Sequence, residues 1–278
     1  MAVDLHTHSR YSDGSDTPAE VVGKGVAAGL SALALTDHDL LDGIDEARAA
    51  AGSDIELVPG TEISVEWRGR AMHLLAYWVE DDSPLKERLE EVRRGRSERN
   101  REMVQALIDL GIDTTMSEIE DEAGEGVVGR PHFAAVLVRK GVVETISEAF
   151  DQYLATGRPA YRARTRIEAA VAIDLAWRSG AVPVVAHPHT LANNMNGFSD
   201  LFPAFADLGV AGVECHYVEY PQEMRDRVAA LAEAAGLVAT GGSDYHGTYK
   251  PGVAVGVGTG DLRVPDSALE GLESRRRH

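Results

Sequence analysis

The stretch Leu30-Ser-Ala-Leu-Ala-Leu-Thr-Asp-His-Asp39 decides the fold. Its first six residues are mostly apolar, which predicts a short buried strand, and four polar residues follow that strand at once. Thr17 and Pro18 are typical of a helix cap and a first helical position, so a helix is expected to run from there to about Gly29. A second helix is expected around 42–51. A strand between two helices is the unit from which helix-covered parallel sheets are built.

The same alternation returns along most of the chain. Strands are expected over 2–8, 55–58, 181–186, 212–215 and 237–240, and a hairpin over 64–67 and 71–78. Helices are expected over 165–179, 201–208 and 222–235. Histidines or acidic residues follow most of these strands. Because the carboxyl ends of the strands of a β/α barrel converge on one face, the pattern predicts an α/β barrel with one shared pocket.

Residues 81–155 interrupt this alternation with helical patterns only. A long charged helix is expected over 85–110, and shorter helices over 116–122, 131–140 and 146–154. We therefore expect three segments along the chain: a first part of the barrel (1–80), a helical insertion subdomain over the strand ends (81–160) and a second part of the barrel (161–278).

Charge and composition exclude several classes of protein. The 278 residues include 27 basic and 45 acidic side chains, a formal net charge of −18, so most of the surface repels nucleic acids and anionic membranes. Cys215 is the only cysteine, which excludes an intrachain disulfide. The apolar runs are too short to span a bilayer, and the first residues do not resemble a signal peptide. A cytoplasmic protein is expected.

His6-Thr-His8 is the first of several candidate metal-ligand groups. Positions i and i+2 of a strand face the same side, so both imidazoles can reach one ion. The other strand ends and turns enlarge the set to six histidines and three carboxylates: His6, His8, Asp13, His38, Glu62, His73, His187, Asp244 and His246. Imidazoles and carboxylates without thiolates suit Mn²⁺, Fe²⁺ or Zn²⁺. Nine ligands are too many for one ion, so two or three ions are expected.

These segments together resemble the polymerase and histidinol phosphatase (PHP) superfamily. The matching motifs are Asp4-Leu-His-Thr-His-Ser9 with Ser12-Asp-Gly14, Thr36-Asp-His-Asp39, Gly60-Thr-Glu62, Met72-His-Leu74, Ala186-His-Pro188 and Gly242-Ser-Asp-Tyr-His246. In the insertion, Gly129-Arg-Pro-His-Phe-Ala134 and Gly157-Arg-Pro-Ala-Tyr161 resemble the stand-alone PHP phosphoesterases. Characterised members of that group are nucleoside 3′,5′-bisphosphate phosphatases and 5′→3′ exonucleases acting on short RNA.

The resemblance implies a distorted (β/α)₇ barrel with a trinuclear metal site. Carried over by position, His6, His8, Glu62 and Asp244 would hold the first ion. Glu62 would bridge to a second ion held by His73 and His187, and Asp13, His38 and His246 would hold a third. No ligand of the family pattern is missing from the chain. Three divalent cations would supply a bridging hydroxide that attacks phosphorus, and Asp13, Glu62, His246 and His189 are the candidate catalytic residues.

The candidate substrate-binding residues are Arg130, His132 and, with a weaker signal, Arg158. A guanidinium binds phosphate bidentately and keeps its charge, although Arg130-Pro131 is also typical of a helix start. His189 follows His187 by two positions, so it is either a pocket residue or a structural histidine. Six arginines crowd the helix expected over 85–110, and we interpret them as a solvated face rather than a track for an RNA backbone: Arg88, Arg93, Arg94, Arg96, Arg99 and Arg101.

The sequence thus predicts a metal-dependent phosphoesterase acting on nucleoside 3′,5′-bisphosphates or on the 5′ ends of short RNA. The nearest alternative is a phosphatase of a small metabolite such as histidinol phosphate. Another is a PHP module that works with a DNA polymerase on a separate chain. The expected partner is a small phosphorylated substrate, and no membrane or obligate protein partner is indicated.

Overall fold

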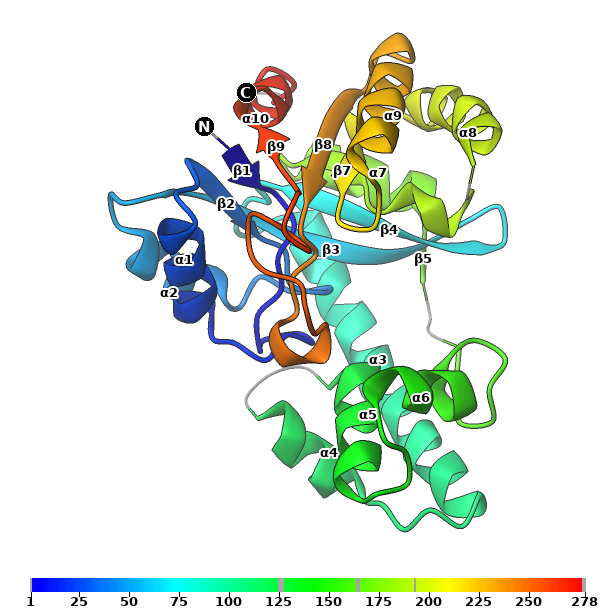
Figure 1. The fold of residues 1–278 in the computed structure, drawn as a ribbon. Helices are drawn as coiled ribbons and strands as arrows, with labels where there is room; N and C mark the ends of the chain where they lie inside the picture. Colours follow the sequence, from blue (N-terminus) through cyan, green and yellow to red (C-terminus); the bar gives the residue numbers. More distant parts are fainter. Residues whose placement is uncertain (1, 125–127, 164–165, 193, 277–278) are drawn as a thin grey trace.

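The computed structural model describes residues 2–124, 128–163, 166–192 and 194–276. A barrel-like sheet with covering helices forms one part of the molecule, and a helical insertion lies beyond one end of it (Figure 1). Among the described residues, no helix is both long enough and apolar enough to cross a membrane. The expected α/β barrel with a helical insertion is confirmed.

The sheet follows the order β8-β7-β6-β4-β3-β2-β1-β9, with β5 paired to β3. Its strands are β1 (Ala2–Asp4), β2 (Ala32–Leu35), β3 (Glu56–Trp67), β4 (Arg70–Tyr77), β5 (Ile167–Glu168), β6 (Val182–Val185), β7 (Gly212–Tyr217), β8 (Val238–Gly242) and β9 (Val264–Pro265). Most neighbours are parallel, but β4 runs antiparallel to both β3 and β6, and the short β9 runs antiparallel to β1. The hairpin of β3 and β4 is the distortion in the barrel.

Hydrogen bonds between the first and last parallel strands bring the barrel close to closure. The amide of Leu5 donates to the carbonyl of Gly241 at 3.1 Å, and the amide of Asp244 donates to the carbonyl of His6 at 2.9 Å. At Gly242 any side chain would overlap the Cβ and backbone nitrogen of His6. Glycine is therefore required where β8 meets the chain that follows β1.

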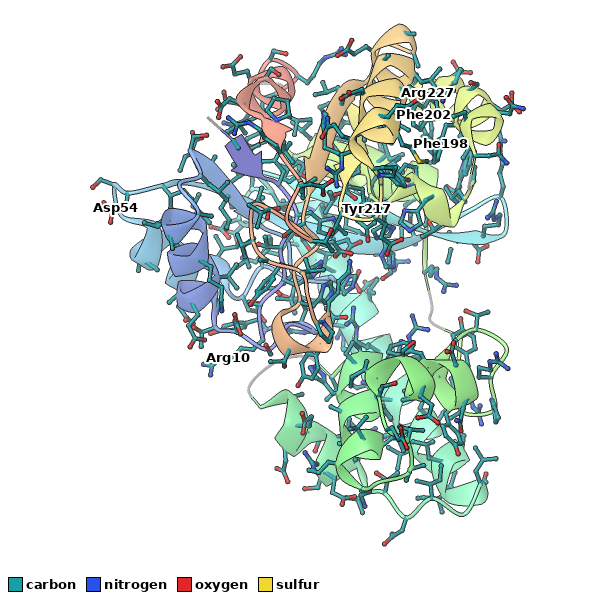
Figure 2. All side chains as sticks on the ribbon, viewed as in Figure 1. Arg10, Asp54, Phe198, Phe202, Tyr217 and Arg227 are labelled. Atoms are coloured by element: carbon teal, nitrogen blue, oxygen red, sulfur yellow. The ribbon has the colours of Figure 1, made fainter. Side chains whose placement is uncertain are left out.

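Six helices cover the outside of the sheet: α1 (Pro18–Ala27), α2 (Ile44–Ala51), α7 (Ala169–Arg178), α8 (Met195–Leu208), α9 (Gln222–Ala234) and α10 (Asp266–Glu273). In α1, Thr17 and Glu20 form a reciprocal capping box and Pro18 occupies the first turn, as their sequence predicts. Phe198 and Phe202 of α8 are fully buried against the sheet in a cluster with Val185 and Val213 (Figure 2).

The insertion has its own apolar core. It consists of α3 (Pro84–Asp109), α4 (Met116–Ala123), α5 (Arg130–Arg139), α6 (Ile146–Ala149) and a π-helical turn (Phe150–Leu154). Met103, Leu107, Phe133 and Leu137 form the centre of this core. Helix α3 is long enough to leave the barrel and enter the insertion, so it connects the two parts (Figure 1).

Several expected boundaries were wrong. The strands expected over 55–58 and 64–67 are one strand, β3, which pairs with β2 through Pro59 and with β4 from Gly60 onward. Pro59 and Gly60 therefore mark the point where β3 changes its pairing partner, not the point where the strand ends. The helix expected from residue 165 begins at Ala169, after the short β5, and α8 begins at Met195 instead of residue 201.

Candidate metal centre

The nine candidate ligands of the sequence all lie together at one end of the barrel, where β1, β2, β6 and β8 have their carboxyl ends. His6, His8 and Asp13 follow β1, and His38 follows β2. Glu62 lies within β3 and His73 within β4, while His187 follows β6 and Asp244 and His246 follow β8. Each has a nitrogen or oxygen within 4 Å of one on another member of the set. Six separate loops and strands therefore build one site.

Glu62 lies at the centre of this set. Its Oε1 is 2.7 Å from His73 Nδ1 and 2.9 Å from His187 Nε2. Its Oε2 lies 3.2–3.3 Å from nitrogens of His6, His8 and His38. The two oxygens of one buried carboxylate thus face two different groups of imidazoles, which is the arrangement of a carboxylate that can bridge two ions.

Three groups of these side chains have the spacing of metal sites, with the ligand atoms of each group within 4.8 Å of one another. They are His6, His8, Glu62 and Asp244; His38, Glu62 and His73; and His8, Asp13, His38 and His246. The first is the set that the resemblance implies. In the other two, His38 and His8 are shared between neighbouring groups, and His187 reaches the second group through Glu62 Oε1.

Unsatisfied polar atoms in this site fit a bound cation. Glu62 Oε2 and His38 Nδ1 are buried and 3.2 Å apart, yet neither has a hydrogen-bond partner among the described residues. Buried polar atoms without partners are costly, and a cation between them would remove that cost. The chemistry of the donor set, imidazole and carboxylate, also suits divalent ions.

Burial and neighbouring charges shift the pKa values of several side chains in the site. Burial opposes the ionisation of Asp13, but the neighbouring His38 and His246 outweigh it and hold the pKa of this carboxyl well below its usual range. Burial lowers the pKa of His38 to about 3, despite Asp13 and Glu62 nearby. For His8, burial is outweighed by Asp244 and Glu62, which raise its pKa to about 10. Ionised carboxylates and a neutral His38 are ready as ligands.

Glu214 supports the site from β7 and was missed by the sequence analysis. Its Oε1 is 2.9 Å from His6 Nδ1, and its Oε2 accepts a 2.6 Å hydrogen bond from the amide of His187. A carboxylate on the far nitrogen of a ligand imidazole fixes the orientation and tautomer of the ring. The sequence offered one signal for Glu214, an acidic residue within an apolar strand, but no motif included it.

A bulge in β7 explains why His216 is not part of the site. The register with β8 shifts between Glu214 and His216, so Glu214 and Tyr217 both point into the barrel although they are three residues apart. His216 instead has Arg225, Asp226 and Glu233 of α9 as its charged neighbours. Simple alternation along the strand would have turned His216 inward.

Tyr217 and Lys250 hold the outer oxygen of Asp244. The Tyr217 hydroxyl donates to Asp244 Oδ2 at 2.9 Å, and Lys250 Nζ donates to the same atom at 2.8 Å (Figure 2 labels Tyr217). The other oxygen, Oδ1, then faces His6 and His8 at 3.5 and 3.4 Å. Asp244 has a positive φ of 51°, a strained conformation that these contacts keep in place.

A cavity of about 280 Å³ opens above the cluster and ends under the insertion. Asp13, His38, His73 and His187 line the barrel side. Arginines and aromatic rings line the opposite side: Arg99, Arg130, Phe150, Tyr161, Arg162 and Arg166. Of the described residues that line this cavity, Asp13 is the only carboxylate. The cavity thus has candidate metal ligands on one side and four arginines on the other, and this arrangement suits the negative charge of a phosphate ester.

The sequence-predicted substrate residues lie in different places. Arg130 lines the cavity, with its guanidinium 5.5 Å from the centre of the Phe150 ring. His132 is buried, and its Nδ1 accepts a 3.0 Å hydrogen bond from the amide of Gly129, which caps α5. Arg158 is exposed and is not among the cavity-lining residues. His189 lies behind His187, with its ring 4.9 Å from that of Tyr217.

Comparisons with known proteins agree with this geometry. The PHP domain family matches residues 4–158. The 3′,5′-nucleoside bisphosphate phosphatase of Chromobacterium violaceum is 33% identical over 91% of this chain and 90% of its own length. The 5′-3′ exoribonuclease of Haemophilus influenzae is 34% identical over 87% of this chain and 89% of its own.

A solved structure from Bifidobacterium adolescentis, assigned as a metal-dependent phosphoesterase, is 28% identical. It superimposes with a TM-score of 0.87 over 99% of this chain and 96% of its own. Fold, site and family together define the class, a metal-dependent phosphoesterase. The chain belongs to the PHP domain family.

Proposed function

We propose that this phosphoesterase hydrolyses phosphate esters of nucleotides, either nucleoside 3′,5′-bisphosphates or the 5′ ends of short RNA. The observation that carries the proposal is a cavity lined on one side by four of the nine candidate metal ligands and on the other by four arginines. A volume of about 280 Å³ suits one nucleotide better than a folded nucleic acid. The strongly acidic surface elsewhere confines any contact with RNA to this region.

Three divalent ions, Mn²⁺, Fe²⁺ or Zn²⁺, are part of the proposal. His6, His8, Asp13, His38, Glu62, His73, His187, Asp244 and His246 would hold them. Such ions neutralise phosphoryl charge and lower the pKa of water, so that hydroxide is available near neutral pH. Among these residues, Asp13, Glu62 and His246 are the proposed catalytic residues, because Asp13 lines the cavity, His246 lies 3.4 Å from Asp13, and Glu62 lies between two groups of imidazoles.

The arginines would bind and orient the phosphate. Arg130 is held by the Phe150 and Tyr161 rings at 5.5 and 5.9 Å, so its guanidinium is placed before substrate arrives. We assign His132 to the support of Arg130 through the start of α5. His189 stays a candidate proton donor, because burial lowers its pKa and the ring, once protonated, gives up its proton more readily than an exposed histidine. Arg158 could contact only a longer substrate that leaves the cavity.

Charge in the cavity favours a nucleotide over histidinol phosphate. The amine end of histidinol phosphate is a cation, and the described lining offers four arginines and only Asp13 as a carboxylate. A PHP module serving a polymerase is less favoured, because the chain matches 90% of a relative named 3′,5′-nucleoside bisphosphate phosphatase.

The test is phosphate release from adenosine 3′,5′-bisphosphate, 5′-AMP, histidinol phosphate and a short 5′-phosphorylated RNA. Each is incubated with Mn²⁺ or with chelator, beside the double variant Asp13→Ala/His246→Ala. We expect metal-dependent turnover of the bisphosphate or stepwise shortening of the RNA, lost in the variant. Turnover of histidinol phosphate alone would contradict the nucleotide assignment.

A further inference from the structure

A second cavity lies on the insertion side of the barrel, apart from the metal centre. It has a volume of about 390 Å³ and is formed between α3, α4 and two loops of the barrel. We call it the α3 pocket, and its polar lining comprises Tyr11, Asp42, Arg93, Arg96, Ser97, Asn100, Arg101 and Glu120. None of these residues lines the metal cavity.

Arg96 is the unusual residue of the α3 pocket. Its side chain is only 1% exposed, and its Nη2 donates to Asp39. Its Nε and Nη1 are buried without any hydrogen-bond partner among the described residues. A buried guanidinium with two unsatisfied nitrogens is costly, because each N–H has lost its water and gained nothing in exchange. A group with several acceptor oxygens would satisfy them.

The other described polar side chains around the pocket do not supply hydrogen-bond acceptors for Arg96 Nε and Nη1. Arg93 already pairs with Asp42, at 2.7 Å between Nη1 and Oδ2. Asn100 is fully engaged, since its Oδ1 accepts from Arg99 and its Nδ2 donates to the carbonyl of Val128. Glu120, the remaining carboxylate of the lining, is exposed at the rim. Within the described lining, an oxyanion from outside is the group that fits Arg96.

We propose that the α3 pocket is a second anion site that binds a phosphate group at Arg96. One turn of α3 separates it from the metal cavity, because Arg99 lines that cavity while Arg96 and Asn100 line the pocket. The phosphate belongs either to the backbone of an RNA whose 5′ end lies at the metals or to a free small phosphorylated molecule. The proposal requires only an oxyanion, so it does not depend on which ester is hydrolysed.

The test places a negative charge in the pocket without touching Arg96. Ser97 is exposed and lines the pocket, so Ser97→Glu leaves the Arg96–Asp39 pair intact. Ser97→Gln controls for size. Arg94→Gln makes the same change in net charge on the same helix outside the pocket lining. The probe is inorganic phosphate, titrated calorimetrically into chelator-treated protein, so turnover plays no part.

We expect Ser97→Glu to weaken phosphate binding about tenfold or more by charge repulsion, and both controls to stay within about twofold of the native protein. Crystals soaked in tungstate should show anomalous density beside Arg96 Nε and Nη1. Equal phosphate affinity in all four proteins would overturn the proposal. Tungstate density combined with unchanged affinity in solution would mean an adventitious ion only, and would also overturn it.

Short RNA then distinguishes the two sources of the phosphate. The affinities of 5′-AMP and of 5′-phosphorylated RNAs of increasing length are measured with chelator present. If the site holds an RNA backbone, Ser97→Glu weakens the longer RNAs and leaves 5′-AMP unchanged. If it holds a free small molecule, the variant weakens inorganic phosphate and leaves every RNA unchanged. Both results support the anion site.

Discussion

Glu214 holds two parts of the metal centre at once, through the ring of His6 and the backbone of His187. We expect Glu214→Gln to lower metal affinity about 10- to 100-fold, because the amide keeps the shape but loses the charge that favours a liganding imidazole. Competition with a fluorescent chelator measures this change. Glu233→Gln, on the exposed face of α9, is the matched control. Equal metal affinity in Glu214→Gln and native protein would show that the carboxylate does not tune the site.

Asp16 ties the loop after β1 to the end of β8. Burial opposes its ionisation, but hydrogen bonds from Lys24, Tyr245 and Ser15 outweigh burial and keep its pKa below the usual value. Its contribution to stability is therefore present above the unfolded pKa near 4 and is lost as pH falls through the lower folded pKa. The group is partly solvated, so we expect about 1 kcal/mol at most.

Asp16→Asn tests this linkage. Its free energy of unfolding should lie below that of the native protein at pH 7, and the gap should close as the pH falls below about 4. Denaturant titrations across this range, with chelator present to remove metal effects, measure the gap. A gap that stays constant with pH would mean that the charge of Asp16 contributes nothing.

Single residues also show where sequence reasoning ends. The nine candidate ligands, which the structure brings together, were predicted because histidines and acids follow strands in short local motifs. Tyr217 could not be predicted, since its inward direction comes from a bulge that no motif marks. The arginines of α3 were interpreted as a solvated face, but Arg96 and Arg99 are 1% and 6% exposed. Only the docking of the insertion on the barrel decides which arginines of a charged helix are buried.

At the scale of elements, the junction of β1 and β8 depends on Gly242. We expect Gly242→Ala to destabilise the protein by about 3 kcal/mol and to weaken metal binding, since the added methyl group overlaps His6. Gly23→Ala in α1 is the control, because its Cβ meets open space and should stabilise the helix by about 0.5–1 kcal/mol. Thermal unfolding and metal titration of both variants test the pair. Gly242→Ala with native stability would mean that the junction is more tolerant than its geometry indicates.

Most helices and strands were predicted from the sequence, but β3 was predicted as two separate strands. Its two halves read as separate strands, because Pro59 and Gly60 are ordinary strand breakers. In the sheet they stand where β3 leaves β2 and begins to pair with β4. A change of partner is a property of three strands together, so the sequence of one strand does not contain it.

For the whole molecule, metal binding and folding are coupled. The ligands come from residues 6 to 246, so a site with the complete set exists only in the folded chain. A metal at about 100 times its dissociation constant should add about 2.7 kcal/mol to stability. For a chain of this size that raises the melting temperature by roughly 5–10 °C. Calorimetry with Mn²⁺ and with chelator should show this rise in the native protein and a smaller one in Asp13→Ala/His246→Ala. An identical melting temperature in both solutions would contradict it.

The junction of β1 with β8 also means that the site can be completed only late in translation. His6 leaves the ribosome early, but Asp244 and His246 are translated about 240 residues later. At a translation rate of 5–20 residues per second, Asp244 and His246 are made roughly 12–48 s after His6. A growing chain therefore carries an incomplete ligand set through most of translation, and the full complement of metal can be loaded only after the last strands have been made.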